Sequence, residues 1–251
     1  MPLDDLRYFT YTHMNCNDLW EAYFGQLEKH SPPIQHTVII NQESKEIPCH
    51  QIQYYDDKNY CQEYAWCLEQ VKEEYVIYMQ EDFFLYHDVD EATLLEYLEV
   101  LKSDDSLSFI RLINSGLVSN VRYNDHDTLF YVTPPDQDHS LDTCFSMQPT
   151  IWKKQRLIDL YKKCGRQTFG EDGFIEPMNE LGIKGLYHFE NEFKRGMMHH
   201  DSNVFPYICT AVVRKKWNTL EYELELSRIA QEYNIDLSKR GHLTHVLEGL
   251  Q

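Results

Sequence analysis

The sequence lacks several features by which whole classes of protein are recognised. Its 251 residues contain no apolar run of transmembrane length, and the segment Met1–Asp5 is acidic where a signal peptide would be basic. The seven cysteines are scattered, odd in number and include no C-x-x-C pair, which argues against a disulfide framework or a zinc site. There is no internal repeat and no low-complexity linker. These absences predict a cytoplasmic protein built as one domain.

Positive charge is also scarce. Lys and Arg number 23 against 41 Asp and Glu, so the formal net charge is -18. This excess argues against nucleic acid or an anionic membrane as the main partner. It does not exclude a nucleotide, because one metal ion and a few basic side chains can reverse the field at a site. The 18 Tyr, 12 Phe and 4 Trp suit stacking on a nucleobase or sugar ring, although most aromatic side chains fill cores.

Strand-like and helix-like segments alternate in the first half of the chain. The patterns predict strands at residues 6–12, 36–40, 51–55, 75–80 and 109–113, and helices at 18–30, 60–74 and 90–101. Such alternation is typical of βαβ units. The predicted fold class is therefore α/β, with a Rossmann-type, mostly parallel central sheet flanked by helices.

The second half is irregular and mixed. Strands are predicted at residues 129–132, 144–147 and 207–213, and helices at 151–163, 173–181 and 220–233. Gly182 is expected to end the second of these helices. No clean boundary separates the two halves.

The most informative stretch is residues 75–85, an apolar run interrupted by Glu81 and Asp82. Continuous apolarity without polar alternation fits a strand buried on both faces of a sheet. Carboxylates are costly inside such a sheet, so we expect them at its C-terminal edge, where open α/β sheets bind ligands. Two hard oxygen donors there suit Mn²⁺ or Mg²⁺ holding a phosphate or diphosphate. The alternative is a strand end with solvated acids.

A second acidic cluster surrounds the start of the helix predicted at residue 173. It consists of Glu171, Asp172 and Glu176. Each of the three could be a helix cap or a surface acid. A metal-holding acid pair and a separate carboxylate that accepts a proton are, however, the minimum for moving a glycosyl group from a nucleotide diphosphate to a hydroxyl.

These segments resemble the GT-A class of nucleotide-sugar glycosyltransferases, in particular bacterial surface-polysaccharide transferases. The strand end Gln80-Glu81-Asp82 is similar to the Asp-x-Asp element that holds Mn²⁺ or Mg²⁺ against the donor diphosphate, although the first aspartate is missing. Residues 169–184 are similar to the Glu-Asp segment of the inverting, processive-type branch. Residues 145–154 are similar to the strand-to-helix junction that faces the acceptor. The resemblance runs loosely from Leu6 to Trp217.

The resemblance implies a role for each candidate residue. Asp172 would be the general base, with Glu176 and then Glu171 as alternatives, and a late loop would fold over the donor. The candidate donor-contact residues are Thr10, Thr12, His13, Asp56, Asp57, Glu81, Lys194 and Arg195. The candidate metal ligands are Asp82, Glu81, His199 and His200. Of the donor contacts, Asp56 or Asp57 would meet the base, and Lys194 and Arg195 the diphosphate.

The resemblance further implies a single GT-A-like domain over residues 1–251. Its nucleotide-sugar-binding half would be about residues 1–114, its acceptor and catalytic half about 115–217, and a C-terminal helix and tail 218–251. The expected activity is inverting transfer from a nucleotide-diphosphate sugar, such as a UDP-sugar, to a glycan. The resemblance places this transfer in surface polysaccharide synthesis, with peripheral association with membrane-bound assembly machinery.

Two alternatives stay open. A sugar nucleotidyltransferase shares the fold type and the metal, but would normally show a Gly-rich basic loop after the first strand. Residues 12–17 contain no Gly, Lys or Arg, which disfavours that enzyme. A catalytically silent domain of the same fold could instead bind a glycan or a partner protein.

Overall fold

The computed structural model describes residues 3–55, 59–116, 118–140, 144–166, 171–196 and 199–244. Its strands are β1 (Leu6–Tyr11), β2 (Gln35–Ile40), β3 (His50–Gln53), β4 (Tyr75–Gln80), β5 (Phe109–Arg111), β6 (Leu129–Tyr131), β7 (Thr150–Lys153), β8 (Gly185–His188), β9 (Val212–Val213) and β10 (Lys216–Trp217). Its α-helices are α1 (Asn17–His30), α2 (Tyr60–Glu69), α3 (Glu91–Ser103), α4 (Lys154–Cys164), α5 (Ile175–Glu180) and α6 (Thr219–Glu232). Short 3-10 helices are η1 (Met14–Cys16), η2 (Glu171–Phe174) and η3 (Leu237–Lys239).

The central sheet runs mostly in one direction. Its strand order is β3-β2-β1-β4-β7-β5-β8-β6, with β9 and β10 forming a separate hairpin. The pairs β1–β2, β1–β4, β2–β3 and β5–β8 are parallel, whereas β7 is antiparallel to β4 and β5, and β6 is antiparallel to β8. The carboxyl ends of β1 to β5 and of β8 therefore open at one edge, which we call the carboxyl edge. This topology confirms the predicted α/β class.

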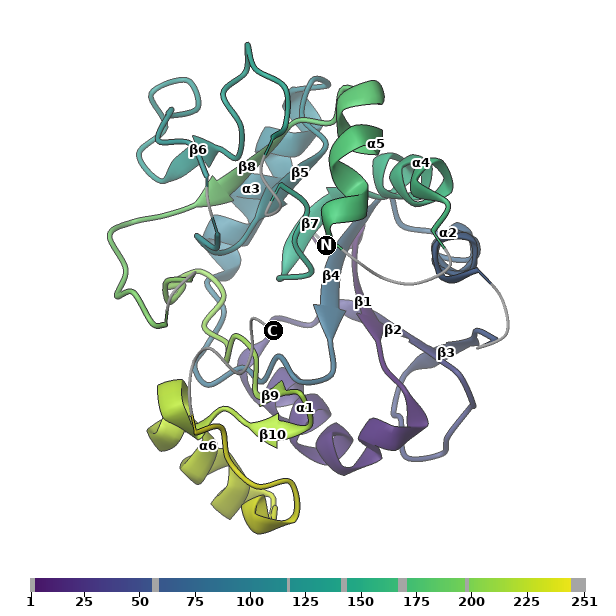
Figure 1. Ribbon diagram of the computed structural model, residues 1–251, viewed down its shortest axis with the longest axis vertical. Coiled ribbons are helices and arrows are strands. Elements are labelled where there is room, and N and C mark those ends of the chain that lie inside the picture. The colour runs from purple at the N-terminus through teal and green to yellow at the C-terminus, as the bar shows by residue number, and fades with distance from the viewer. Residues whose placement is uncertain are drawn as a thin grey trace.

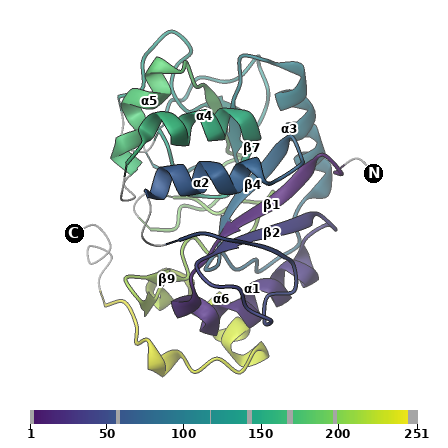
Figure 2. The same cartoon turned by 90° about the vertical axis from the view of Figure 1, so that its right-hand side faces the viewer.

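Helices cover both faces of the sheet (Figures 1 and 2). One core lies between the sheet and helices α1 and α3, with a contribution from α6. The other lies under α2, α4 and α5, and α2 and α4 run side by side there (Figure 2). Along β4, Ile77 and Met79 enter the first core, while Val76 and Tyr78 enter the second. Because both faces of β4 are buried, its sequence shows no polar alternation.

Capping residues mark several element ends. The Asn59 side chain caps α2 by accepting from the Gln62 amide at 3.1 Å, and Asp90 caps α3 in the same way. Gly182 follows α5 with φ +57°, as the sequence suggests. Helix α2 ends at Glu69, five residues earlier than predicted. No helix among the described residues combines the length and apolarity that a bilayer crossing needs.

Three predictions in the second half are wrong. Residues 144–147 do not form a strand, and residues 150–153 form β7 instead of the start of a helix. Residues 207–213 contribute only a single bridge, between Leu85 and Tyr207, and the two-residue β9. For residues 150–153, pairing with distant strands overrides the local helical pattern, since β7 is inserted between β4 and β5.

Strand β8 is absent from the prediction because Gly185 weakens its pattern. A Cβ atom at this position would lie 2.2 Å from the Phe109 ring. Gly185 therefore lets the β5 side chain cover the β8 backbone, which is a packing role that the local sequence does not reveal.

A partly buried ion pair joins β1 to the segment before β4. The Arg7 guanidinium donates to the Glu73 carboxylate at 2.5 and 2.6 Å, and both side chains are about nine-tenths covered. Burial alone would raise the pKa of Glu73, but the Arg7 hydrogen bonds lower it overall. Charged Glu73 therefore stabilises the fold above its ordinary pKa, and this contribution is lost as pH falls through the lowered value.

We predict that Glu73→Gln lowers the free energy of unfolding by about 1–3 kcal/mol at pH 7, because it leaves Arg7 without its charged partner. The difference from the unmodified protein should shrink as the pH falls below 4.5, the pKa of an unperturbed Glu. Urea denaturation at pH 7 and pH 3.5 measures both values. As a control, Glu69→Gln removes an exposed pair with Lys162 and should have little effect. If the free energy of unfolding falls equally in the two variants, the buried ion pair contributes no more to stability than the exposed pair.

Candidate functional site

The acid pair lies where the sequence places it, directly after β4 at the carboxyl edge. Gln80 is the last residue of β4 and Glu81 and Asp82 form the following turn, closed by a hydrogen bond from the Phe83 amide to the Gln80 carbonyl at 3.2 Å. Strand β1 runs parallel to β4, with Tyr11 opposite Gln80. This register brings the chain that follows β1, including η1, beside the acid pair.

Asp82 is buried, with 7% of its surface exposed, and its Oδ2 accepts from the Val212 amide at 3.4 Å. Burial and the neighbouring Glu81 charge raise the pKa of Asp82 well above its ordinary value. Burial also raises the pKa of Glu81. The alternative of a solvated strand end is therefore wrong for Asp82. Ionising both acids without an added cation is unfavourable in this environment.

Two further side chains meet the acid pair. Cys16, at the end of η1, lies beside Glu81, and burial together with the Glu81 charge raises the pKa of the Cys16 thiol. Arg240 donates to the Asp18 carboxylate at 2.5 and 2.7 Å, and its positive charge acts on Glu81. Sequence reasoning missed both residues. Arg240 and Asp18 are 222 positions apart, so no local signal could have joined them.

The donor set of this site fits a hard divalent cation only in part. Across the described ranges, no three His, Cys, Asp or Glu side chains come together in a way that could hold a metal. Two adjacent carboxylates remain, and Mg²⁺ sites commonly use one or two carboxylates together with substrate phosphates and water. Glu81 and Asp82 therefore fit a cation that arrives with a diphosphate, and not a closed protein cage.

His199 and His200 are not gathered with the acid pair into such a group. The His199 ring stacks on Tyr222, with its Nε2 at 3.7 Å from a Glu221 carboxylate oxygen. Burial lowers the pKa of His199 to about 4, so the ring is neutral at pH 7. The His200 ring packs edge-on against Phe189 with centroids 5.0 Å apart. Both histidines have aromatic neighbours in place of the expected metal shell.

The two basic residues of the late loop differ in their surroundings. Lys194 is exposed. Arg195 forms ion pairs with Asp201 at 2.9 Å and Glu225 at 2.5 Å, and its guanidinium lies 4.7 Å from the centre of the Tyr222 ring. Two carboxylates already neutralise Arg195, so it ties the loop to α6. This arrangement counts against the expected diphosphate contact.

The candidate donor contacts at the end of β1 and directly after it also differ in their surroundings. Thr10 is buried, and its hydroxyl is hydrogen bonded to Tyr23 at 2.6 Å and His36 at 2.7 Å. The Thr12 hydroxyl is likewise buried and accepts from the Trp20 indole. These two side chains face the core. His13 caps η1 by accepting from the Asn15 amide. Asp56 and Asp57 lie outside the described residues.

The second acidic cluster begins in η2, which contains Glu171 and Asp172; their side chains lie outside what the structure describes. Glu176 is exposed in the first turn of α5. The Phe174 ring stacks on Phe145 with centroids 4.0 Å apart, which fixes η2 against the α2 and α4 core.

The end of α4 lies beside the start of α2. The Cys61 amide, at the start of α2, donates to the Arg166 carbonyl at 3.3 Å. Helix α2 follows β3, so its first turn lies at the carboxyl edge. The end of α4 therefore lies at the edge that also holds the acid pair.

No known protein-family profile matches the chain, and no curated protein matches its sequence. Among solved structures, the mannosyltransferase PcManGT of Pyrobaculum calidifontis in complex with GDP-Man and Mn²⁺ is 12% identical, covers 76% of this chain and has a TM-score of 0.44. The chain spans only 58% of that mannosyltransferase.

Two other solved structures show similar likeness. S. aureus TarS, residues 1–349, is 12% identical over 94% of this chain and 68% of its own, with a TM-score of 0.47. A CMP:2-keto-3-deoxy-manno-octonic acid synthetase complexed with CTP is 9% identical over 77% of this chain and 90% of its own, with a TM-score of 0.47. At these identities and scores, the likenesses carry no activity over to this chain.

We predict that Asp82→Asn raises the melting temperature in metal-free buffer at pH 8. Because burial raises the pKa of Asp82, the folded state binds more protons than the unfolded state between the ordinary and the raised value, and stability falls as pH rises through that window. The amide removes this cost, and 1 kcal/mol corresponds to about 2–4 °C for a domain of this size.

Differential scanning calorimetry with EDTA at pH 5 and pH 8 tests this prediction. The gain in melting temperature from Asp82→Asn should be larger at pH 8 than at pH 5. Asp105→Asn, at a fully exposed position, is the matched control and should leave the melting temperature unchanged at both pH values. A lower melting temperature for Asp82→Asn would instead make the carboxylate a structural acceptor for the Val212 amide.

Proposed function

We propose that this chain is a glycosyltransferase that moves a sugar from a nucleotide-diphosphate donor to a glycan hydroxyl. The observation that carries the proposal is the acid pair Glu81–Asp82 at the end of the central strand β4, with Asp82 buried and Glu81 half-buried. Two like charges largely withdrawn from water are unfavourable alone and favour binding of a cation. Its place at the carboxyl edge is where ligands bind in open α/β sheets. A diphosphate that brings its own divalent cation satisfies both conditions.

In this proposal Glu81 and Asp82 would hold Mn²⁺ or Mg²⁺ together with the donor phosphates and water. When bound, the cation would offset the charge that builds up on the departing nucleoside diphosphate. The positive charge of Arg240 also acts on Glu81, while its guanidinium is paired with Asp18.

The residue proposed to activate the acceptor lies in η2. We assign Asp172 as general base on the motif resemblance, with Glu176 as the alternative. A carboxylate at pH 7 is ionised and can accept a proton without tuning. The acceptor oxygen bonds to the anomeric carbon as the carbon–oxygen bond to the diphosphate breaks, and the hydroxyl proton passes to Asp172. One direct displacement of this kind inverts the anomeric configuration.

The pathway follows the same resemblance. We assign the acceptor to a growing surface polysaccharide, with the reaction on the cytoplasmic side and peripheral contact with membrane-bound assembly machinery. Release of nucleotide from a panel of UDP-, GDP- and CMP-sugars tests the activity itself. A chain that binds nucleotide but releases none, with or without glycans, would be the catalytically silent alternative.

For the donor site, we predict that Asp82→Asn weakens Mn²⁺-dependent binding of UDP or GDP by about tenfold or more, because even residues behind metal ligands contribute 10–100-fold to metal affinity. Calorimetric titration of each nucleotide with and without Mn²⁺ measures the effect. The exposed Asp105→Asn is again the control. Metal-dependent affinity that is unchanged in Asp82→Asn would remove the metal assignment.

For the base, we predict that Asp172→Asn leaves donor affinity nearly intact and lowers turnover by about 10²–10⁴-fold, the usual contribution of a positioned general base. Glu176→Gln, four residues along the same segment, is measured in parallel and should be mild. If Glu176→Gln abolishes turnover while Asp172→Asn does not, the base is Glu176 and Asp172 is a structural residue.

A further inference from the structure

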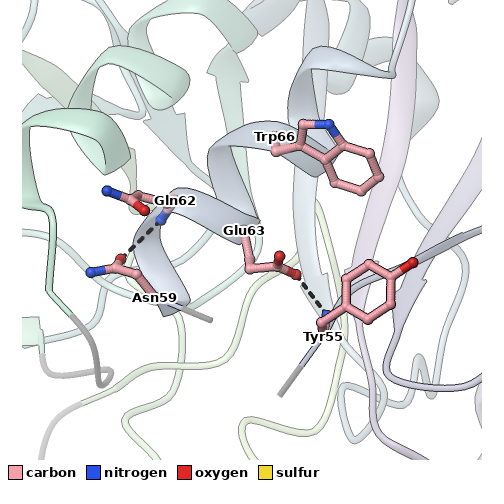
Figure 3. A pocket seen from close by; sticks show the side chains of 5 residues that line it. All are labelled: Tyr55, Asn59, Gln62, Glu63 and Trp66. Carbon is pink, nitrogen blue, oxygen red and sulfur yellow. Dashed lines mark hydrogen bonds between the residues drawn. The ribbon is translucent and has the colours of Figure 1, made fainter. Parts of the chain in front are cut away.

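A pocket of about 340 Å³ lies beyond the end of β3, between that strand and the exposed side of α2. It is lined by Tyr55, Asn59, Gln62, Glu63 and Trp66, and we call it the aromatic pocket (Figure 3). No step of the proposed reaction uses it.

Two aromatic side chains stand open to solvent at this pocket. Tyr55 is 50% exposed and Trp66 is 45% exposed. A tryptophan is usually well covered, and leaving this much ring surface in water forgoes the free energy of burial. Single exposed apolar residues are common on proteins. Two large rings that border one cavity are a different case, because together they offer a ligand two apolar faces.

The pocket is held by contacts that do not depend on a ligand. The buried Glu63 carboxylate accepts from the Tyr55 amide at 2.7 Å, which fixes the end of β3 to α2 (Figure 3). Asn59 caps α2, and its Nδ2 donates to the Gly165 carbonyl at 2.7 Å. Both rings therefore project from a fixed backbone, so a ligand would bind without ordering the chain first.

The described residues that line the pocket narrow the class of ligand. They include no Lys or Arg, and their one carboxylate, Glu63, is held by the Tyr55 amide. These residues therefore favour a neutral ligand over a phosphate or a cation. The exposed amide of Gln62 can both donate and accept, and aromatic faces cover apolar C–H surfaces. A neutral molecule that is apolar on its faces and hydroxylated around its rim meets these conditions, and a pyranose ring has that form.

The pocket is also tied to the acceptor side of the site. Asn59 contacts Gly165 through its side chain, and the Cys61 amide contacts Arg166. The Cys164 thiol, at the same end of α4, donates to the Gly173 carbonyl of η2 at 3.5 Å. The pocket and η2, the segment of the proposed base, are therefore both held by the end of α4.

We propose that the aromatic pocket binds a saccharide unit of the glycan acceptor, away from the bond being formed. Tyr55 and Trp66 would stack on the sugar, and Gln62 would bond its hydroxyls. The identity of this glycan as acceptor rests on the proposed function, whereas binding of a saccharide does not. The two ideas can therefore fail separately.

The test is saccharide binding by the whole chain. An array of oligosaccharides of neutral hexoses, N-acetylhexosamines and uronic acids identifies the probe, and calorimetric titration with that oligosaccharide gives its affinity. Tyr55→Ala and Trp66→Ala should each weaken binding by about tenfold, the size expected for loss of one stacked aromatic pair. Trp66→Phe should retain most of the affinity. Leu224→Ala, at a 71% exposed position on α6, is the control and should have no effect.

Each other outcome has one meaning. The proposal is overturned if no oligosaccharide on the array binds, or if Trp66→Ala and the unmodified chain have equal affinity for the saccharide. Weaker UDP binding in Trp66→Ala, without a change in saccharide affinity, makes it a nucleobase site and overturns the proposal. Saccharide binding that depends on Trp66 in a chain that releases no nucleotide supports the pocket and overturns the proposed enzyme. In an active enzyme, Trp66→Ala should raise KM for the glycan.

Discussion

Two carboxylates at the end of a strand that is buried on both faces constrain the rest of the site. Glu81 and Asp82 cannot move toward the sheet, because Val76 to Met79 fill both cores. Asp82 also cannot reach open solvent, because the β9 hairpin lies against it, while Glu81 is half-buried beside the chain after β1. The acids therefore keep raised pKa values, and the fold retains a cost that a bound cation would relieve. Such a cost is expected where function, and not stability, decides the residues.

The antiparallel strand β7 explains how the second half of the chain reaches the same edge. Because β7 runs opposite to β4, helix α4 starts at the far edge of the sheet and returns to the carboxyl edge. The Cys164 thiol at the end of α4 contacts the Gly173 carbonyl of η2. A parallel strand in the same position would have placed α4 in the other direction. The reversal of one four-residue strand thus brings the end of α4, with η2 beside it, to the edge that holds the acid pair.

The parts of the fold that could be predicted are those whose signal is local. Strand β4 and its acids follow from an uninterrupted apolar run, and α2 and α3 begin at side chains that cap them. Strands β7 and β8 could not be predicted, since each has four residues and is defined by its neighbours in the sheet. The same holds for the site. Arg195 reads as a free cation in the sequence, but Glu225 on α6 neutralises it.

The contact between Arg240 and Asp18 affects the order in which the surroundings of the acid pair assemble during synthesis. Arg240 reaches back to Asp18 in α1, and backbone bonds between Trp217 and the segment around His242 hold this part of the chain in place. The positive charge beside Glu81 is therefore supplied from position 240. A nascent chain can assemble β1, β4 and the acid pair long before this residue leaves the ribosome. Until it does, the acids stand without that charge, so the electrostatic environment of the acid pair is complete only after most of the sheet has been synthesised.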